Sequence, residues 1–474
     1  MSTETALQPA ETLARSRRLA VWGAAGLGLG GTWFWLYSPW ESGMLTALAI
    51  GIFWLGFIPM LRWLQRNDDS YPLIEVLQLT LVPFYAIPLI TEHSAIADYP
   101  ESVLERAAGL VICFQLGCSL GGFLRSRTYV AKPRRGWLTE EVFGPGALRL
   151  TAYTLTLNTA WLLVSGFQLV EIPREVFGTF RAIFFGIGTI SLFIQARLWG
   201  AGRLDLIGRI LLVANLGLQM AFTFRSLLLI TGLILLLIAL IGYFSTARRL
   251  PWVAIAVALP VVAILHNGKH QMRAEYWGEY ARSTGLAELP DFYAEWFRHG
   301  LSADRGGSRT SLLLERASLL QIVCYVVETV PEQSPHLGGR TYWLIPPQVF
   351  PRFLWPQKPS PNDSVKMLSV HLGLLSAEQA EHTSIGYGLI SEAVANFGLA
   401  GVAVLAVVLG WLLRWVSLGT AHTPTLSVPG IFRILCLAWC LSAETTLVVW
   451  LSSFYQACIA VFVPLMAWRL VANR

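Results

Sequence analysis

The chain has 474 residues, of which 54% are hydrophobic and only 14% are charged. About one-quarter of the residues in an average soluble globular protein are charged, so this composition excludes that class. The formal net charge is +6, but the basic residues are not gathered into the stripe that nucleic-acid-binding proteins show. The 6 Cys form no CxxC pair, so neither a disulfide framework nor a zinc site is indicated. The chain is therefore expected to lie in a lipid bilayer.

Twelve apolar stretches are long enough to cross a hydrocarbon core about 30 Å thick as helices. Their expected bounds are Leu19–Tyr37, Met44–Leu61, Tyr71–Ile90, Val103–Leu124, Leu148–Val170, Val176–Ala196, Leu204–Phe222, Phe224–Phe244, Pro251–Leu265, Leu389–Leu413, Ile431–Thr446 and Leu447–Trp468. Nine spans thus fall within residues 19–265 and three within residues 389–468. The first is followed by Tyr37-Ser38-Pro39-Trp40 rather than by small residues, so it is expected to stay as an anchor and not to be cleaved.

The basic residues of the short connections predict the orientation, because loops rich in Lys and Arg stay on the cytoplasmic side. If the tails 1–18 and 469–474 are cytoplasmic, nearly all of these basic residues lie inside, and only Arg174 lies in a short outer connection. This orientation places one long segment, residues 266–388, outside the cytoplasm. The chain is therefore expected to form one membrane domain with a single large extracytoplasmic loop.

The outer loop contains two distinctive stretches. Ser311–Thr329 has polar residues spaced by three or four among apolar ones, which predicts an amphipathic helix at the outer membrane surface, with a thirteenth span as the alternative. Ile345–Pro361 contains six prolines, which are expected to preclude helix and to fix a rigid extended path. Arg352 and Lys358 lie in this proline-rich frame, and Arg340 lies upstream of it.

Aromatic residues lie between these basic residues, at Phe350, Phe353 and Trp355. Basic groups framed by aromatic rings at a membrane surface suit an amphiphile with an anionic head, such as a lipid-linked diphosphate. An interfacial aromatic belt with snorkelling basic side chains is the alternative interpretation.

Ionisable residues at membrane depth are costly, so each is a candidate for function. Arg225 lies in the hairpin between two predicted spans, where it is expected either to bind an anion or to snorkel to the interface. Glu392 lies near the outer end of the tenth span, with Asn396 one turn later on the same face. A carboxylate partly withdrawn from water can act as a general base or acid, while pairing with a loop Arg is its structural alternative. Glu444 and Glu328 are secondary candidates.

Histidine spacing gives little support for a metal site. His266 and His270 have the i, i+4 spacing of a helical metal pair, but Asn267-Gly268 lies between them and the usual zincin Glu does not follow. No acidic cluster stands out as a ligand set, so no metal ligand or cofactor is predicted, and the sequence leaves open whether the protein needs a divalent metal.

Four stretches together resemble the Wzy-type O-antigen polymerases, also called oligosaccharide repeat unit polymerases. GGRTYW and, after it, VFPRFLWPQKP lie in the outer loop. The stretch TSIGYGLISEAVANFGLAGVAVLAVVLG leads into the next span, and FRSLLLITGLILLLIALIGYFSTARR lies ahead of the loop. The resemblance covers mainly residues 220–413, together with the plan of many spans and one large outer loop.

The resemblance implies an all-α integral membrane protein of the bacterial inner membrane, GT-C-like, with about 12 transmembrane helices and a periplasmic loop. It implies an enzyme that moves a growing glycan from its undecaprenyl diphosphate carrier to the sugar end of another lipid-linked repeat unit, which builds an O-antigen or exopolysaccharide. The matching positions for substrate and diphosphate contacts are Arg225, Arg340, Arg352, Lys358 and Asn396, and Glu392 is the matching position for the catalytic base.

The implied partners are the lipid-linked oligosaccharide, as donor and acceptor, and a chain-length regulator and flippase of the same pathway. Two other functions stay open. An O-antigen ligase, or another lipid-linked-sugar transferase, would share this plan, and the histidines of the loop leave a ligase open. A lipid-linked oligosaccharide flippase or transporter would suit twelve spans, although the chain shows no paired halves.

Overall fold

In the computed structural model, the described residues are 42–65, 71–90, 94–128, 147–167, 174–225, 229–244, 252–276, 287–302, 319–350, 354–382, 384–421, 427–442 and 444–472, with a few isolated positions between them. These residues form helices and turns, and no strand occurs among them. The predicted first span, Leu19–Tyr37, lies almost entirely outside the described residues. Arg352 also lies outside them.

Six helices of the described residues are long and apolar enough to cross a membrane. They are Gly43–Trp63, Leu73–Ile90, Glu101–Arg127, Ile183–Gly200, Leu206–Phe224 and Gly388–Gly419. Shorter apolar helices are Gly232–Phe244, Leu319–Thr329, Val428–Cys440 and Leu447–Val463. The chain is therefore an all-helical multi-pass membrane protein, and the six long helices match six of the twelve expected spans.

The chain divides into two compact units. Unit 1 is formed by residues up to Thr139, by Leu314–Pro424 and by Trp439–Gln456, and unit 2 by the remainder. Unit 1 contains α2 (Gly43–Gln65), α3 (Leu73–Leu81), the π-helix η1 (Val82–Ala86), α4 (Ile87–Ile90), α5 (Ser94–Ala97), α6 (Glu101–Thr128), α14 (Leu319–Thr329), the 3-10 helix η3 (Tyr342–Leu344), α15 (Ile345–Gln348), α16 (Asp363–His371), α17 (Gln379–His382) and α18 (Gly388–Gly419). Unit 2 contains α7 (Ala147–Gly166), α8 (Arg174–Gly200), α9 (Leu206–Phe224), α10 (Leu229–Phe244), α11 (Trp252–Tyr276) and α12 (Leu289–Ser302), and both units take residues from α19 (Val428–Cys440) and α20 (Leu447–Ala472).

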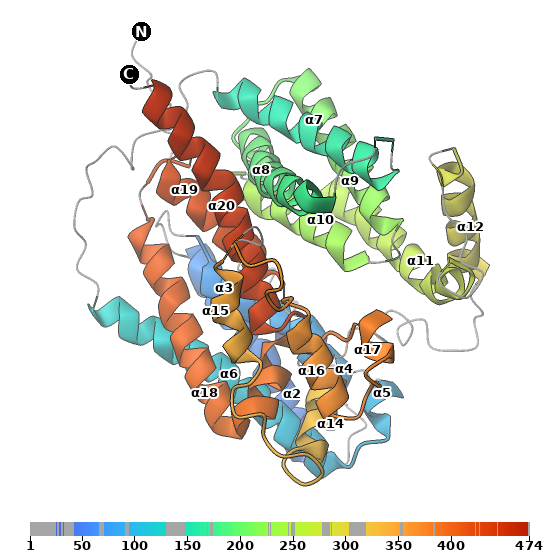
Figure 1. Cartoon of the computed structure of the whole chain (residues 1–474), viewed down its shortest axis with the longest axis vertical. Coiled ribbons are helices and arrows are strands. Elements are labelled where there is room, and N and C mark those ends of the chain that lie inside the picture. Colours follow the sequence, from blue (N-terminus) through green and yellow to red (C-terminus); the bar gives the residue numbers. More distant parts are fainter. Residues whose placement is uncertain are drawn as a thin grey trace. The chain divides into compact units, whose positions relative to one another are not determined.

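Close backbone contact between α6 and α18 forms the centre of unit 1 (Figure 1). A Cβ atom added to Gly121 of α6 would meet the Val407 carbonyl, and one added to Gly410 of α18 would meet the Cys118 carbonyl. Small residues of this kind let helices in a bilayer approach closely, where van der Waals packing replaces the hydrophobic effect. Glycine on both helices therefore fixes the position of α18 within unit 1.

Buried amide side chains add hydrogen bonds between the helices of unit 1. The Gln78 amide nitrogen on α3 donates to the Gln115 carbonyl, at 2.9 Å, and to the Ser119 hydroxyl. The Gln115 amide nitrogen on α6 donates to the Ile52 carbonyl of α2, at 3.0 Å. Since lipid offers no hydrogen bonds, these side chains join α2, α3 and α6 at the points where they cross.

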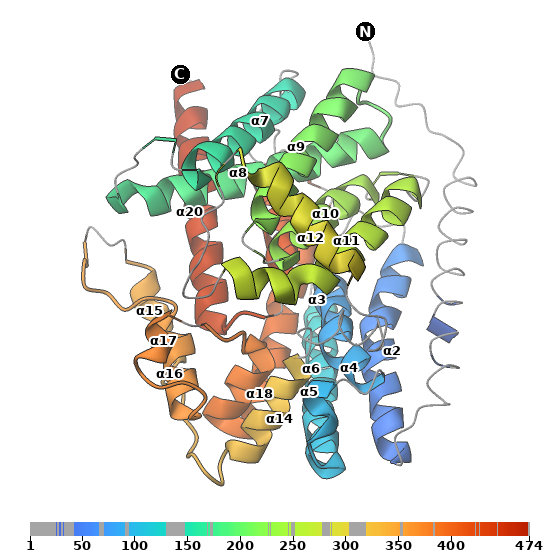
Figure 2. The same cartoon turned by 90° about the vertical axis from the view of Figure 1, so that its right-hand side faces the viewer.

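Residues 266–388, which the sequence predicts as the outer loop, are shared between the two units. Its first residues continue α11 as far as Tyr276, and residues up to Leu313 belong to unit 2, whereas residues from Leu314 onward belong to unit 1. Within unit 1, α14 packs against α6 and α18, and α15, α16 and α17 follow it (Figure 2). The chain therefore divides the polar segment between two units.

The expectation that the prolines of Ile345–Pro361 preclude helix is wrong at its start. Ile345–Gln348 forms α15, directly after the 3-10 turn Tyr342–Leu344. Pro346 and Pro347 lie in the first turn of α15. A proline is tolerated there because the first amides of a helix have no intrahelical partner, so its missing N–H costs no hydrogen bond.

Candidate functional site

The first three turns of α18 carry three fully buried polar residues, Ser391, Glu392 and Asn396. The Glu392 Oε2 atom accepts a hydrogen bond of 2.6 Å from the backbone N–H of Leu447, which is the first residue of α20. The first amides of a helix lack intrahelical partners and lie at the positive end of its dipole. One oxygen of the Glu392 carboxylate therefore caps α20.

The other carboxylate oxygen, Glu392 Oε1, is buried and makes no hydrogen bond of ordinary length with the described residues, and the Thr341 hydroxyl is a longer hydrogen-bonding neighbour of the carboxylate. The hydroxyl groups of Tyr342, Ser391 and Thr445 are likewise buried and unpaired within that part of the chain. Native proteins pair almost all buried polar atoms, with each other or with water, so a group of unpaired ones indicates a place for water or a ligand. The Glu392 carboxylate and the nearby Tyr342 hydroxyl define the candidate site, the Glu392 site.

Tyr342 is electrostatically coupled to Glu392. Burial, and then the negative charge of Glu392, raise the pKa of the Tyr342 hydroxyl above its ordinary value. Tyr342 therefore keeps its proton at neutral pH and offers a hydrogen-bond donor beside the carboxylate. Among the described residues, no Lys, Arg or His nitrogen lies within ion-pairing distance of Glu392. The expected alternative, an ion pair with a loop Arg, is thus not formed within that part of the chain.

The segment GGRTY is fastened to α18 by backbone and side-chain hydrogen bonds. Gly338 and Gly339 have φ angles of 58° and 87°, which glycine adopts without the penalty a side chain would incur. This turn directs the Gly338 N–H to the Asn396 carbonyl, at 3.1 Å, and the Gly339 N–H to Asn396 Oδ1, at 3.0 Å. The Asn396 amide nitrogen donates to the Thr341 hydroxyl and to the Glu392 carbonyl, both at 2.8 Å. Asn396 thus joins Thr341 to the turn of helix that carries Glu392.

A break in α18 provides acceptors for this attachment. Gly398 has φ 63° and ψ −147°, so the helix is interrupted one and a half turns after Glu392. The carbonyl groups of Ala395 and Asn396 lie at this break and accept from the N–H groups of Leu337 and Gly338. Two of the segments that carry the family resemblance, GGRTYW and SEAVANFG, therefore meet at the Glu392 site.

The predicted basic residues lie in different surroundings. Arg340 is exposed, one residue before Thr341. Lys358 is buried, and its ammonium group donates to the Phe350 carbonyl at 2.8 Å and to the Gln348 carbonyl at 3.4 Å, which closes the loop after α15. Arg225 belongs to unit 2, where its guanidinium donates to the Gly166 carbonyl at 3.0 Å and lies over the Phe167 ring, 4.7 Å from the centroid.

The two secondary acidic candidates are also placed. Glu444 lies beside the start of α18. Its backbone carbonyl accepts a hydrogen bond of 3.0 Å from the Gly388 N–H, and a Cβ atom added to Gly386 would lie 3.5 Å from the Cβ atom of Glu444. Glu328 is exposed near the end of α14. Glu444 is therefore a neighbour of the segment that leads into the Glu392 site.

Sequence reasoning did not single out Tyr342, Thr341 or Thr445. The signal available for the first two was their place in GGRTYW, directly after Arg340. Thr445 offered none, because its position depends on α20 starting beside α18, which no local pattern encodes.

The comparisons with known proteins give one result. A family model described as "Domain of unknown function (DUF8712)" matches residues 149–422, which is more than half of the chain and includes Arg225, Glu392 and Asn396. No curated protein and no solved structure matches the chain. The chain belongs to the DUF8712 family.

Proposed function

We propose that this protein is a membrane glycosyltransferase that polymerises undecaprenyl-diphosphate-linked oligosaccharide repeat units at the outer face of the bacterial inner membrane. The observation that carries the proposal is the Glu392 site, where a buried carboxylate has one unpaired oxygen. The resemblance of GGRTYW and SEAVANFG to repeat unit polymerases supports the same assignment, because these two segments form the site together.

In the proposed reaction, Glu392 Oε1 accepts the proton of an acceptor-sugar hydroxyl. The resulting oxygen attacks the anomeric carbon of the donor glycan, and the bond from that carbon to the carrier diphosphate breaks. The diphosphate leaves with the bonding electron pair, and the proton remains on Glu392 until water removes it. Tyr342, which keeps its own proton, donates a hydrogen bond to a substrate oxygen in this site.

The Glu392 side chain is fully buried, so the proposed reaction requires a neighbouring segment to move. The segment from Leu337 to Tyr342 carries two glycines with positive φ and is tied to α18 through Asn396. Arg340 in the same segment is exposed and suits the leaving diphosphate, whose charge a guanidinium stabilises through paired hydrogen bonds. Closure of this segment over the lipid-linked donor would bring Arg340 and Tyr342 to the substrate together.

Deletion of the gene in its host tests the proposal. Without the protein, the ladder of surface glycan lengths should collapse to a single repeat unit, and the wild-type gene should restore it. Arg340→Ala should restore it poorly at a normal membrane level, whereas Arg106→Ala, which removes an exposed arginine of α6, should restore it fully. A glycan that is polymerised but unattached in the deletion strain would instead indicate a ligase, and lipid-linked units trapped on the inner leaflet would indicate a flippase.

A further inference from the structure

In unit 2, α12 lies firmly against α11. The indole nitrogen of Trp296 donates to the Leu265 carbonyl at 2.6 Å, and the Trp296 side chain is completely buried. A Cβ atom on Gly300 would meet the Ile264 carbonyl, and one on Gly268 would lie 2.7 Å from the Trp296 carbonyl. The two backbones therefore approach closely, which fixes the side chains at the ends of these helices relative to one another.

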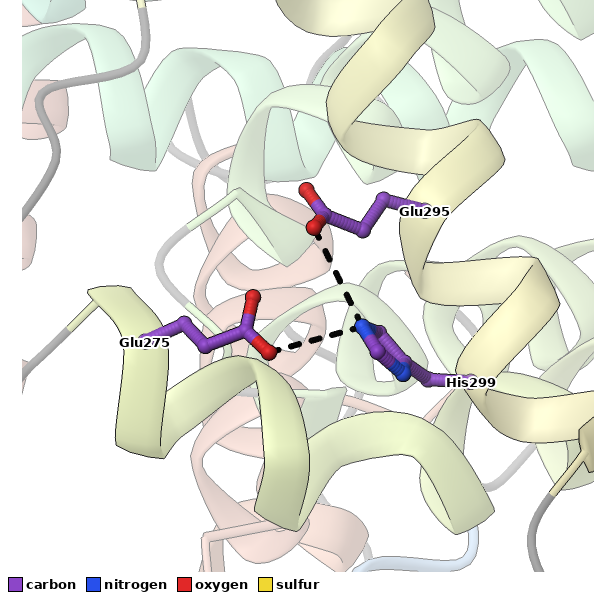
Figure 3. A group of neighbouring side chains, drawn as sticks. All are labelled: Glu275, Glu295 and His299. Carbon is purple, nitrogen blue, oxygen red and sulfur yellow. Dashed lines mark ion pairs between the residues drawn. The ribbon is translucent and has the colours of Figure 1, made fainter.

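Three potential metal ligands meet on these two helices (Figure 3). Glu275 comes from the last turn of α11, and Glu295 and His299 come from α12 with a spacing of four residues. One ligand atom from each lies within 4.8 Å of the other two. Figure 3 shows the imidazole of His299 directed between the two carboxylates. In the sequence, the only indication of this group is the i, i+4 spacing of Glu295 and His299. Glu275 could not be assigned to the group without knowledge that α11 and α12 pack together.

The distances in this group suit a metal ion better than direct hydrogen bonds. His299 Nε2 lies 3.6 Å from Glu275 Oε1 and 3.9 Å from Glu295 Oε1, beyond the range of an N–H···O hydrogen bond. A tetrahedral ion bound at about 2.1 Å to each ligand holds its ligand atoms roughly 3.4 Å apart. The observed separations are therefore close to those around such an ion.

The burial of His299 Nε2 adds to these distances. This atom is buried and makes no hydrogen bond within the described part of the chain, although the ring as a whole is 23% exposed. A buried ring nitrogen without a hydrogen-bond partner needs a proton acceptor, a water or a metal ion. The orientation of the Glu295 carboxylate is fixed by the Tyr276 hydroxyl, which donates a hydrogen bond of 2.9 Å to Oε2, the oxygen other than the one nearest His299. Ligating carboxylates in metal sites are commonly held by outer hydrogen bonds of this kind.

We propose that Glu275, Glu295 and His299 bind one divalent transition-metal ion with the coordination preference of Zn²⁺. An imidazole nitrogen together with two carboxylates favours zinc over magnesium or calcium, which prefer oxygen ligands alone. Three protein ligands leave a fourth tetrahedral position for water. The ion would join the end of α11 to α12 and strengthen a contact that the Trp296 core already makes. This inference does not depend on the proposed glycan chemistry.

Zinc titration of the full-length chain tests the site. The protein, purified in detergent with a histidine-free tag and stripped with a chelator, is titrated with ZnCl2 in a calorimeter, and its melting temperature is measured with and without Zn²⁺. We expect the wild type to bind Zn²⁺ and to melt at a higher temperature with it, because a ligand that binds only the folded state stabilises it. Mg²⁺ at the same concentration should give neither effect.

Matched variants assign the binding to this group. Glu275→Gln changes an exposed carboxylate, so it should fold normally and weaken zinc binding by about 100-fold, and His299→Gln should do the same. Tyr276→Phe removes the outer hydrogen bond to Glu295 but keeps the aromatic ring, and it should weaken binding by about tenfold. Asp291→Asn, which removes a carboxylate elsewhere on α12, should change nothing.

The competing explanation is that a protonated His299 forms ion pairs with both carboxylates. In that case the wild type and Glu275→Gln would bind Zn²⁺ equally or not at all, and Zn²⁺ would not raise the melting temperature of either. Either result would overturn the proposal.

Discussion

Two substitutions at Glu392 separate its structural role from its proposed chemical one. Glu392→Gln keeps an oxygen that can accept the Leu447 N–H, but it has no carboxylate to take up a proton. Glu392→Ala removes both the acceptor and the base. The Glu392 site therefore predicts that activity is lost in both variants, whereas stability is lost only in the alanine variant.

The structure gives the magnitudes. In Glu392→Ala, the Leu447 N–H at the start of α20 loses its 2.6 Å partner in a buried place, which costs about 1–3 kcal/mol, and the cavity left by the side chain adds to that cost. In Glu392→Gln the hydrogen bond becomes neutral and weaker, but the buried charge with an unpaired oxygen disappears. The free energy of unfolding should therefore stay within about 1 kcal/mol of the wild type. Loss of a general base lowers the rate by roughly 100- to 10,000-fold in either variant.

Both quantities can be measured on the same preparations. Thermal unfolding in detergent gives the stability, and the rate of glycan elongation from lipid-linked repeat units gives the activity. Glu332→Gln, which neutralises an exposed acid in unit 1, serves as the control and should match the wild type in both assays. If Glu392→Gln elongates glycan at the wild-type rate while Glu392→Ala does not, Glu392 serves only as a cap for α20 and the reasoning is refuted.

Three further predictions follow from the same region. Gly339→Ala places a side chain at φ 87° with a Cβ atom 2.8 Å from the Phe397 ring, so it should destabilise unit 1 by about 1–3 kcal/mol in thermal unfolding, and an unchanged melting temperature would contradict the assigned turn. Asn396→Ala leaves the Gly339 N–H and Thr341 hydroxyl without their partner and should cost roughly 2–4 kcal/mol, whereas Asn396→Asp, which keeps the acceptor for Gly339, should cost less. Burial raises the pKa of Tyr387 to about 12, above its unfolded value of about 10. The neutral hydroxyl therefore contributes its full stabilisation below pH 10, and this contribution is lost as the pH rises to 12. In Tyr387→Phe, the free energy of unfolding should fall less over this pH range, by up to roughly 2–3 kcal/mol.

The sequence was sufficient for the class of fold and for part of the site. Runs of apolar residues predicted the helices, and the ends of α2, α6 and α9 lie within a few residues of the expected spans, because hydrophobicity alone determines which segments lie in lipid. The spacing of Glu392 and Asn396 predicted that they share a helix face, and both are buried there.

The rest depended on contacts that no local pattern encodes. The break at Gly398 was not expected, because an isolated glycine within an apolar run reads as a tolerated helix residue, and only its pairing with the GGRTY segment requires φ 63°. No local pattern indicated that residues 266–313 would join one unit and residues 314–388 the other, since pairing of helices distant in sequence determines which unit a residue joins. Glu275 could not be grouped with His299 for the same reason.

Reconstitution of the purified chain tests the central claim most directly. Lipid-linked repeat units extracted from a host strain that lacks the gene are incorporated into liposomes with the wild type or with Glu392→Gln, and the lipid-linked glycans are resolved by length. The account predicts that the wild type converts single units into a ladder of longer lipid-linked chains and releases undecaprenyl diphosphate, while Glu392→Gln leaves single units. Single units that stay unchanged with a folded wild-type protein would contradict it.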